Sequence, residues 1–132
     1  MILVGKCILI LSLTLLLFGC QQINEEKADN TDSVESISIY KMIGFSEIIE
    51  ESLNVITDSE EINSIEEIIK GAEKVAGIVD VFDPHYQVEI GGKTYYLWIH
   101  NKEAATIMDE EDTRTVYKIS GNLVERLIEV IR

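Results

Sequence analysis

The chain has 132 residues, of which 24 are acidic and 11 basic, and its formal net charge is −13. Nucleic acid and anionic lipid headgroups repel a protein this acidic, so we expect the folded part to bind no nucleic acid and to stand off the membrane surface. The length corresponds to one domain with a single modest core.

The N-terminus has the pattern of a secretory signal. Lys6 precedes a largely apolar run from Ile8 to Phe18, which ends at a small residue and turns polar at Gln21. The run is too short to cross the hydrocarbon core of a bilayer, which is about 30 Å thick. We therefore expect a signal peptide over residues 1–19 and no permanent membrane span.

The end of this signal, Leu17-Phe18-Gly19-Cys20, resembles the lipobox of bacterial lipoproteins. The resemblance implies cleavage between Gly19 and Cys20 and a diacylglycerol on the Cys20 thiol. It also implies that the protein is held at the outer face of the cell membrane. The alternative is an ordinary signal peptide with a chance cysteine at its end. Cys7 leaves with the signal in either case, so we expect a domain without disulfide or cysteine metal site.

Residues 20–33 follow as a polar segment with one large apolar side chain, Ile23. Such a composition buries too little surface to offset the entropy lost on ordering. The sequence therefore predicts a flexible tether here and a globular domain over residues 34–132.

The first half of the domain predicts two strands and a helix. Apolar and polar residues alternate from Val34 to Phe45, and a second strand is expected over Leu53–Thr57, with a loop or short helical turn at Glu47–Glu51. Asp58 and Glu61 have the spacing of a capping box, and helical periodicity continues to Ala76. We expect Gly77 to close this helix, with Gly71 inside it at a cost of up to about 1 kcal/mol.

The second half predicts four strands and a final helix. Gly91-Gly92 separates two alternating runs as a two-residue hairpin turn would. Further strands are expected over Ala104–Asp109 and Thr113–Ile119, and Ser120 is placed to cap the last helix. The order β-β-α-β-β-β-β-α indicates a single α+β domain, an antiparallel sheet with two packed helices.

The hairpin supplies the candidate binding face. In its register one face carries Tyr86, Val88, Ile90, Tyr95, Leu97 and Ile99, which form an apolar core face. The opposite face carries Tyr96, Trp98 and His100. Two interpretations are open, because the C-terminal helix either covers these side chains or leaves them exposed for recognition.

Two acidic clusters are candidates for cations. Asp80, Asp83 and His85 surround the turn that contains Pro84, where they are either solvated loop residues or cation ligands. The run Asp109–Asp112 lacks the alternating spacing and glycine of a calcium loop, so we interpret it as a charged hairpin turn. The sequence predicts no metal and no cofactor.

Catalytic motifs such as GxSxG, HExxH, the P-loop and GxGxxG do not occur in the sequence. We therefore expect a non-enzymatic binding or interaction module of the cell envelope, whose partner is an envelope protein or a small ligand. The alternative is an envelope hydrolase or transferase that uses Asp and Glu as acid–base groups.

Three stretches resemble a known family. Gly77-Ile-Val-Asp-Val-Phe-Asp-Pro-His-Tyr86, Tyr96-Leu-Trp-Ile99 and Tyr117-Lys-Ile-Ser120 are similar to the YhfM-like small lipoproteins of Gram-positive bacteria. The resemblance extends over Val34–Arg132 and the signal. It implies a single exported α+β domain and a Gram-positive source, and it implies no catalytic residues, because the family has no assigned activity.

Overall fold

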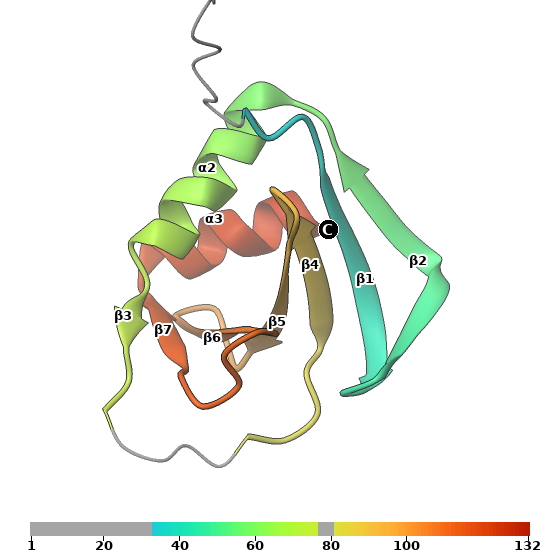
Figure 1. The fold of residues 1–132 in the computed structure, drawn as a ribbon. Coiled ribbons are helices and arrows are strands. Elements are labelled where there is room, and N and C mark those ends of the chain that lie inside the picture. The colour runs from blue at the N-terminus through green and yellow to red at the C-terminus, as the bar shows by residue number, and fades with distance from the viewer. Residues whose placement is uncertain (1–32, 77–80) are drawn as a thin grey trace, which may run out of the picture. The chain divides into compact units, whose positions relative to one another are not determined.

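A computed structural model describes residues 33–76 and 81–132, and these residues belong to one compact unit. Seven strands make one antiparallel sheet with two helices (Figure 1), which confirms the predicted α+β class and the order of the predicted elements. A two-residue strand at Glu73–Lys74 is additional and lies where the sequence predicted helix. The predicted signal, tether and lipidation site lie outside the described residues. No helix within the described ranges is long and apolar enough to cross a bilayer.

The strands and helices follow one another along the described chain. They are β1 (Ile37–Gly44), β2 (Glu47–Ile56), α2 (Ser59–Lys70), β3 (Glu73–Lys74), β4 (Tyr86–Ile90), β5 (Lys93–Ile99), β6 (Ala104–Asp109), β7 (Tyr117–Ser120) and α3 (Asn122–Ile131). Their order across the sheet is β2-β1-β4-β5-β6-β7-β3.

Several boundaries differ from the prediction, among them the start of β7 at Tyr117, where the sequence predicted Thr113. The segment expected as a loop or helical turn at Glu47–Glu51 is the start of β2 and pairs with β1. Helix α2 ends at Lys70, with Gly71 as its C-cap, so the predicted closure at Gly77 was wrong and Gly71 is not interior to the helix. Gly77 itself lies outside the described residues. The last helix is preceded by Gly121 as N-cap in place of Ser120.

The N-terminal cap of α2 is confirmed. The Asp58 carboxylate accepts hydrogen bonds from the backbone N–H groups of Glu60 and Glu61, each at 3.0 Å. These bonds satisfy two of the donors that a helix N-terminus leaves unpaired. The helix then buries Ile62, Ile65 and Ile68 on one side.

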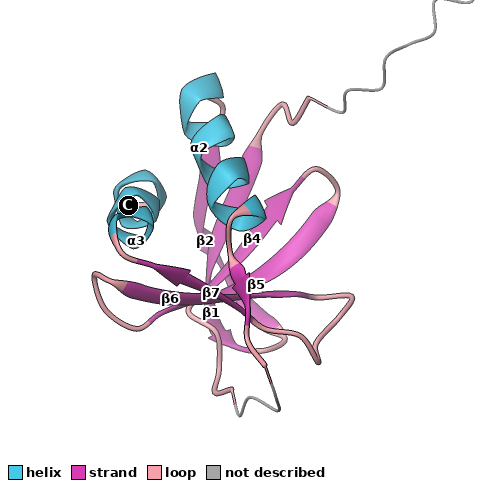
Figure 2. Cartoon of the chain, turned by 90° about the vertical axis from the view of Figure 1, so that its left-hand side faces the viewer, coloured by secondary structure: helices cyan, strands magenta, loops and turns pink. Residues whose placement is uncertain are grey.

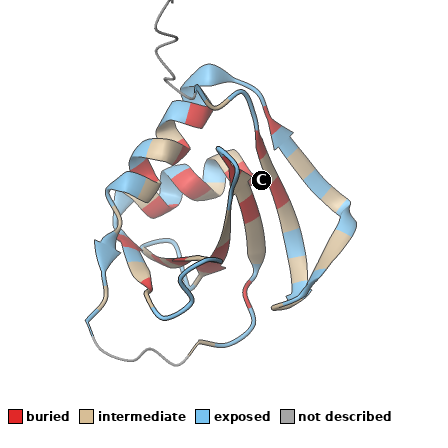
Figure 3. Cartoon of the chain, viewed as in Figure 1, coloured by how far each residue is buried: buried red, intermediate tan, exposed pale blue. Residues whose placement is uncertain are grey.

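The predicted hairpin register is also confirmed. Gly91 and Gly92 have φ values of 56° and 75°, which suit the two-residue turn, and Ile90 pairs with Lys93. Val88, Ile90 and Leu97 consequently share the face on which both helices lie (Figure 2). That face and the helices enclose the main core, in which Ile37, Ala105 and Val124 are fully buried (Figure 3).

The other face of the sheet has a smaller core of its own. Tyr96, Trp98, Met108 and Val116 are buried there. The side chains that pack against them are Met42, Phe45, Val75 and Val81. These covering residues come mainly from turns and connections, because both helices lie on the opposite face.

Candidate functional site

The aromatic face predicted from the hairpin is covered, but not by the C-terminal helix. Trp98 is 1% exposed and Tyr96 is 8% exposed. The Phe45 ring packs against both, with centroid distances of 5.9 Å to Trp98 and 5.6 Å to Tyr96. The expectation of cover by the C-terminal helix was therefore wrong, and neither side chain offers an open recognition surface.

His100, the third member of that face, is exposed, and its Nε2 lies 2.8 Å from the hydroxyl of Thr106. His85 is also exposed, and its Nδ1 accepts a hydrogen bond from the Ile99 N–H at 3.0 Å. Asp80 lies outside the described residues. Within the described part of the chain no three His, Cys, Asp or Glu side chains are grouped as a metal site would require.

A cleft lies on the helix face, at the C-terminal end of α2. It consists of two adjoining cavities of about 230 and 360 Å³, which share Ile69, Lys70, Lys93 and Tyr95. The hairpin-side cavity is completed mainly by Val34, Glu66 and Ile90, and the sheet-side cavity by Ile107, Asp109, Asp112 and Tyr117. We call this feature the α2–β5 cleft.

Strand register places the cleft residues beside one another. Tyr95 of β5 lies opposite Asp109 of β6, and Ile107 lies opposite Tyr117 of β7. Lys93 is two residues before Tyr95, so it shares the same face of the strand. Because α2 ends at Lys70, it leaves this part of the sheet open next to its last turn.

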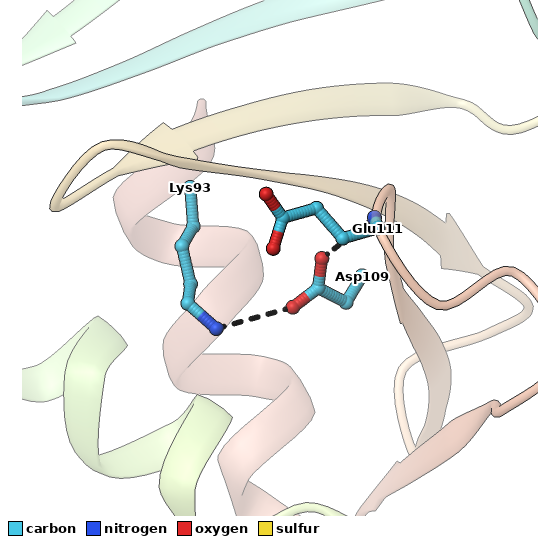
Figure 4. A network of polar contacts seen from close by, with 3 residues as sticks. All are labelled: Lys93, Asp109 and Glu111. Carbon is cyan, nitrogen blue, oxygen red and sulfur yellow. Dashed lines mark hydrogen bonds and ion pairs between the residues drawn. The ribbon is translucent and has the colours of Figure 1, made fainter.

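An ion pair forms the polar wall of the cleft. Lys93 Nζ lies 3.3 Å from Asp109 Oδ2, and Asp109 Oδ1 accepts a 2.9 Å hydrogen bond from the backbone N–H of Glu111 (Figure 4). The hydrogen bond from Lys93 to Asp109 raises the pKa of the lysine above its ordinary value. Lys93 is therefore fully charged at neutral pH, and its side chain is 55% exposed.

Tyr95 contributes a neutral hydroxyl to the cleft. Burial raises the pKa of its phenol, while the positive charge of Lys93 opposes that shift. The nearby Asp109 and Tyr117 act in the same direction as burial. The phenol therefore keeps its proton at neutral pH and remains a hydrogen-bond donor.

This site was not predicted from the sequence, although the sequence contains a signal for it. Lys93 and Asp109 occupy the same strand face as Leu97 and Ile107, which are core residues. In a strand, alternate side chains point to the same face of the sheet. A polar residue on the face that otherwise carries core residues indicates a place where that face is open. The alternation of residues along a strand does not predict where α2 lies over the sheet.

The sequence matches the YhfM protein family over residues 30–132. The chain belongs to the YhfM family. This YhfM domain also resembles a solved structure, a thioesterase-like protein from Clostridium sporogenes ATCC 15579, with a TM-score of 0.53 and 18% sequence identity. The similarity covers 74% of this chain and 94% of the other, and at this identity it concerns the fold alone. The comparison with curated proteins gave no match.

Proposed function

We propose that this YhfM-family chain is an exported lipoprotein, anchored at the outer face of the cell membrane through Cys20. Its folded domain would be a binding module that takes its ligand in the α2–β5 cleft. The division into signal peptide (1–19), lipidated tether (20–33) and domain (34–132) belongs to the same proposal. Support for the anchor comes from the lipobox-like ending before Cys20 and from the polar segment after it.

The single observation that carries the binding function is the composition of the cleft. Its lining combines apolar side chains, such as Ile69 and Ile107, with charged and phenolic groups. A concave site with an apolar lining and a few converging polar groups is typical of small-molecule binding sites, and the larger cavity falls within their usual size range of about 300–1,000 Å³.

The alternative is a hydrolase or transferase, and its candidate acid–base carboxylates in that site are Asp109, Asp112 and Glu66. Both oxygens of Asp109 already accept hydrogen bonds. Hydrogen bonding by Thr115 is the main cause that lowers the pKa of Asp112, so this carboxylate is ionised at neutral pH. An ionised carboxylate can act as a general base but not as a general acid, so Asp112 alone does not supply an acid–base pair.

The anchor is tested by metabolic labelling of growing cells with a fatty-acid analogue. The wild-type protein should carry the label and partition into the membrane fraction, whereas Cys20→Ser should lose the label. Cys7→Ser, which changes the other cysteine, is the matched control and should be labelled normally. Labelling of Cys20→Ser at the wild-type level would overturn the lipoprotein proposal.

The binding site is tested by photo-crosslinking in intact cells. A benzophenone amino acid is placed at position 66, which lines the hairpin-side cavity and leaves both cleft lysines in place, and in a control protein at the exposed position 102. Mass spectrometry of the modified peptide then gives the mass of any captured ligand. A defined adduct at position 66 that is absent at position 102 supports the cleft as the site. Adducts at neither position, or the same adducts at both, would contradict it.

A further inference from the structure

The α2–β5 cleft contains two lysines, beside the carboxylates of Glu66, Asp109 and Asp112. Lys70 and Lys93 line both of its cavities, although the chain has only 11 basic residues against 24 acidic ones. Lys70 comes from the last turn of α2, and Lys93 from the start of β5. Both lysines therefore border the part of the cleft that the two cavities have in common.

The carboxylates on the sheet side of the cleft are already engaged by groups of the protein. Asp109 accepts hydrogen bonds from Lys93 and from the N–H of Glu111, so neither of its oxygens lacks a donor. Asp112 Oδ1 accepts a hydrogen bond of 3.3 Å from the N–H of Arg114. These aspartates stabilise their own turn and have a reduced capacity to bind a cationic ligand.

The lysines, in contrast, retain donors. An ammonium group has three N–H bonds, and Lys93 uses one of them on Asp109. Among the residues that the structure describes, Lys70 forms no ion pair with a carboxylate. Glu66 is the remaining acid, and it lines only the hairpin-side cavity. The free hydrogen-bonding capacity of the cleft is therefore that of a donor-rich site.

The rest of the lining suits the apolar part of a ligand. Ile69 and Tyr95 line both cavities, and Ile107 and Tyr117 form the sheet-side wall. The Tyr95 phenol is neutral at neutral pH, so it adds a donor without adding negative charge. Cavities of about 230 and 360 Å³ limit the ligand to a small molecule or to one group of a larger one.

We infer that the α2–β5 cleft binds a small amphipathic anion, with its carboxylate or phosphate group held by Lys70 and Lys93 and its apolar part against Ile69 and Tyr95. This inference rests on the proposed binding function and specifies the chemistry of the ligand. The same chemistry occurs in a free carboxylic or phosphoric amphiphile and in an anionic lipid headgroup.

Calorimetric titration with short-chain probes tests the inference. The full-length protein is embedded in phosphatidylcholine nanodiscs, and empty nanodiscs serve as the blank. Octanoate and octyl phosphate should bind, and octylammonium and octanamide should bind at least about tenfold more weakly, because charge-assisted hydrogen bonds to the lysines are lost. Equal binding of octanamide or octylammonium would overturn the inference.

Variants locate the anion. Lys70→Gln and Lys93→Gln should each weaken octanoate binding, by about tenfold in the double variant. Lys102→Gln removes the same charge at an exposed position outside the cleft and should bind as the wild type does. An equal effect of Lys93→Gln and Lys102→Gln would show that only net charge matters and would contradict the site.

Phosphatidylglycerol nanodiscs distinguish the two sources of the ligand. If the headgroup of an anionic lipid is the ligand, these nanodiscs should compete with octanoate, and if a free amphiphile is the ligand, they should not. A neutral or cationic adduct captured at position 66 would leave the proposed binding function intact and refute the anion. The absence of both adduct and octanoate binding would refute both.

Discussion

The indole N–H of Trp98 donates a 2.7 Å hydrogen bond to the backbone carbonyl oxygen of Phe82. This bond joins the middle of β5 to the connection before β4 and satisfies the only polar atom of a side chain that is 1% exposed. Trp98 is therefore the centre of the second core, and the connection that contains Phe82 depends on it.

Removing the Trp98 side chain should be as damaging as removing a residue of the main core. We expect Trp98→Ala and Leu97→Ala to lower the free energy of unfolding by about 3–5 and 2–5 kcal/mol, because each leaves a cavity. Trp98→Phe should cost about 1 kcal/mol or more through the lost hydrogen bond. Urea denaturation measures these values. Phe82, whose side chain is 59% exposed, is the control, because Phe82→Ala keeps the carbonyl acceptor. Indole emission typical of a solvated ring would contradict this burial.

Tyrosine ionisation should destabilise the domain at alkaline pH. Burial is the largest cause that raises the pKa of both Tyr95 and Tyr96, and the folded state therefore prefers the neutral phenols. Their contribution to stability is complete below the unfolded pKa of about 10 and is lost as the pH rises through the folded pKa.

Denaturation midpoints measured from about pH 8 to about pH 11 should therefore fall in the wild type and fall less in Tyr95→Phe/Tyr96→Phe. Lys93 also loses a contribution to stability as the pH rises, because Asp109 raises the pKa of its ammonium group. Both proteins retain Lys93, so this loss is common to them. An unchanged alkaline decline in the double variant would refute the assignment to the two tyrosines.

The contribution of the Asp58 cap to the free energy of unfolding should be measurable by substitution of this one residue. Asp58→Ala removes the acceptor of two backbone N–H groups and should lower the free energy of unfolding by about 1 kcal/mol. Asp58→Asn keeps a capping oxygen, so most of the stability should remain. Thermal and urea denaturation of the three proteins provide the test. Equal losses in both variants would assign the effect to charge rather than to capping.

Local patterns predicted the elements whose partners are close in sequence. The Gly91-Gly92 turn set the register of β4 and β5 correctly, because a two-residue turn leaves only one pairing. The end of α2 was missed for a different reason. Val75 and Ala76 continue the apolar spacing of the helix, but the Val75 N–H instead bonds to the carbonyl oxygen of Val116, about forty residues away.

Sequence periodicity could not predict the second core or the cleft, and the physical reason is the same for both. Phe45, Val75 and Val81 pack against the second core from separate parts of the chain outside the helices and strands, and such positions have no periodic signal. The cleft depends on where Lys70 of α2 lies above Lys93 and Asp109 of the sheet. That relation follows from tertiary packing and not from any local sequence.

The sequence predicted Ser120 as the N-cap of α3, whereas the structure has Gly121 there. Gly121 has φ 68° and ψ −142°, a backbone region that L-residues avoid at a cost of about 1–3 kcal/mol. A Cβ at this position would meet no atom within 4 Å beyond its chain neighbours, so Gly121→Ala should lose stability through backbone strain alone. Ser120→Ala should be nearly neutral, because Ser120 is exposed and α3 has no side-chain cap. Urea denaturation of both variants decides the matter, and a larger loss in Ser120→Ala than in Gly121→Ala would restore Ser120 as the cap.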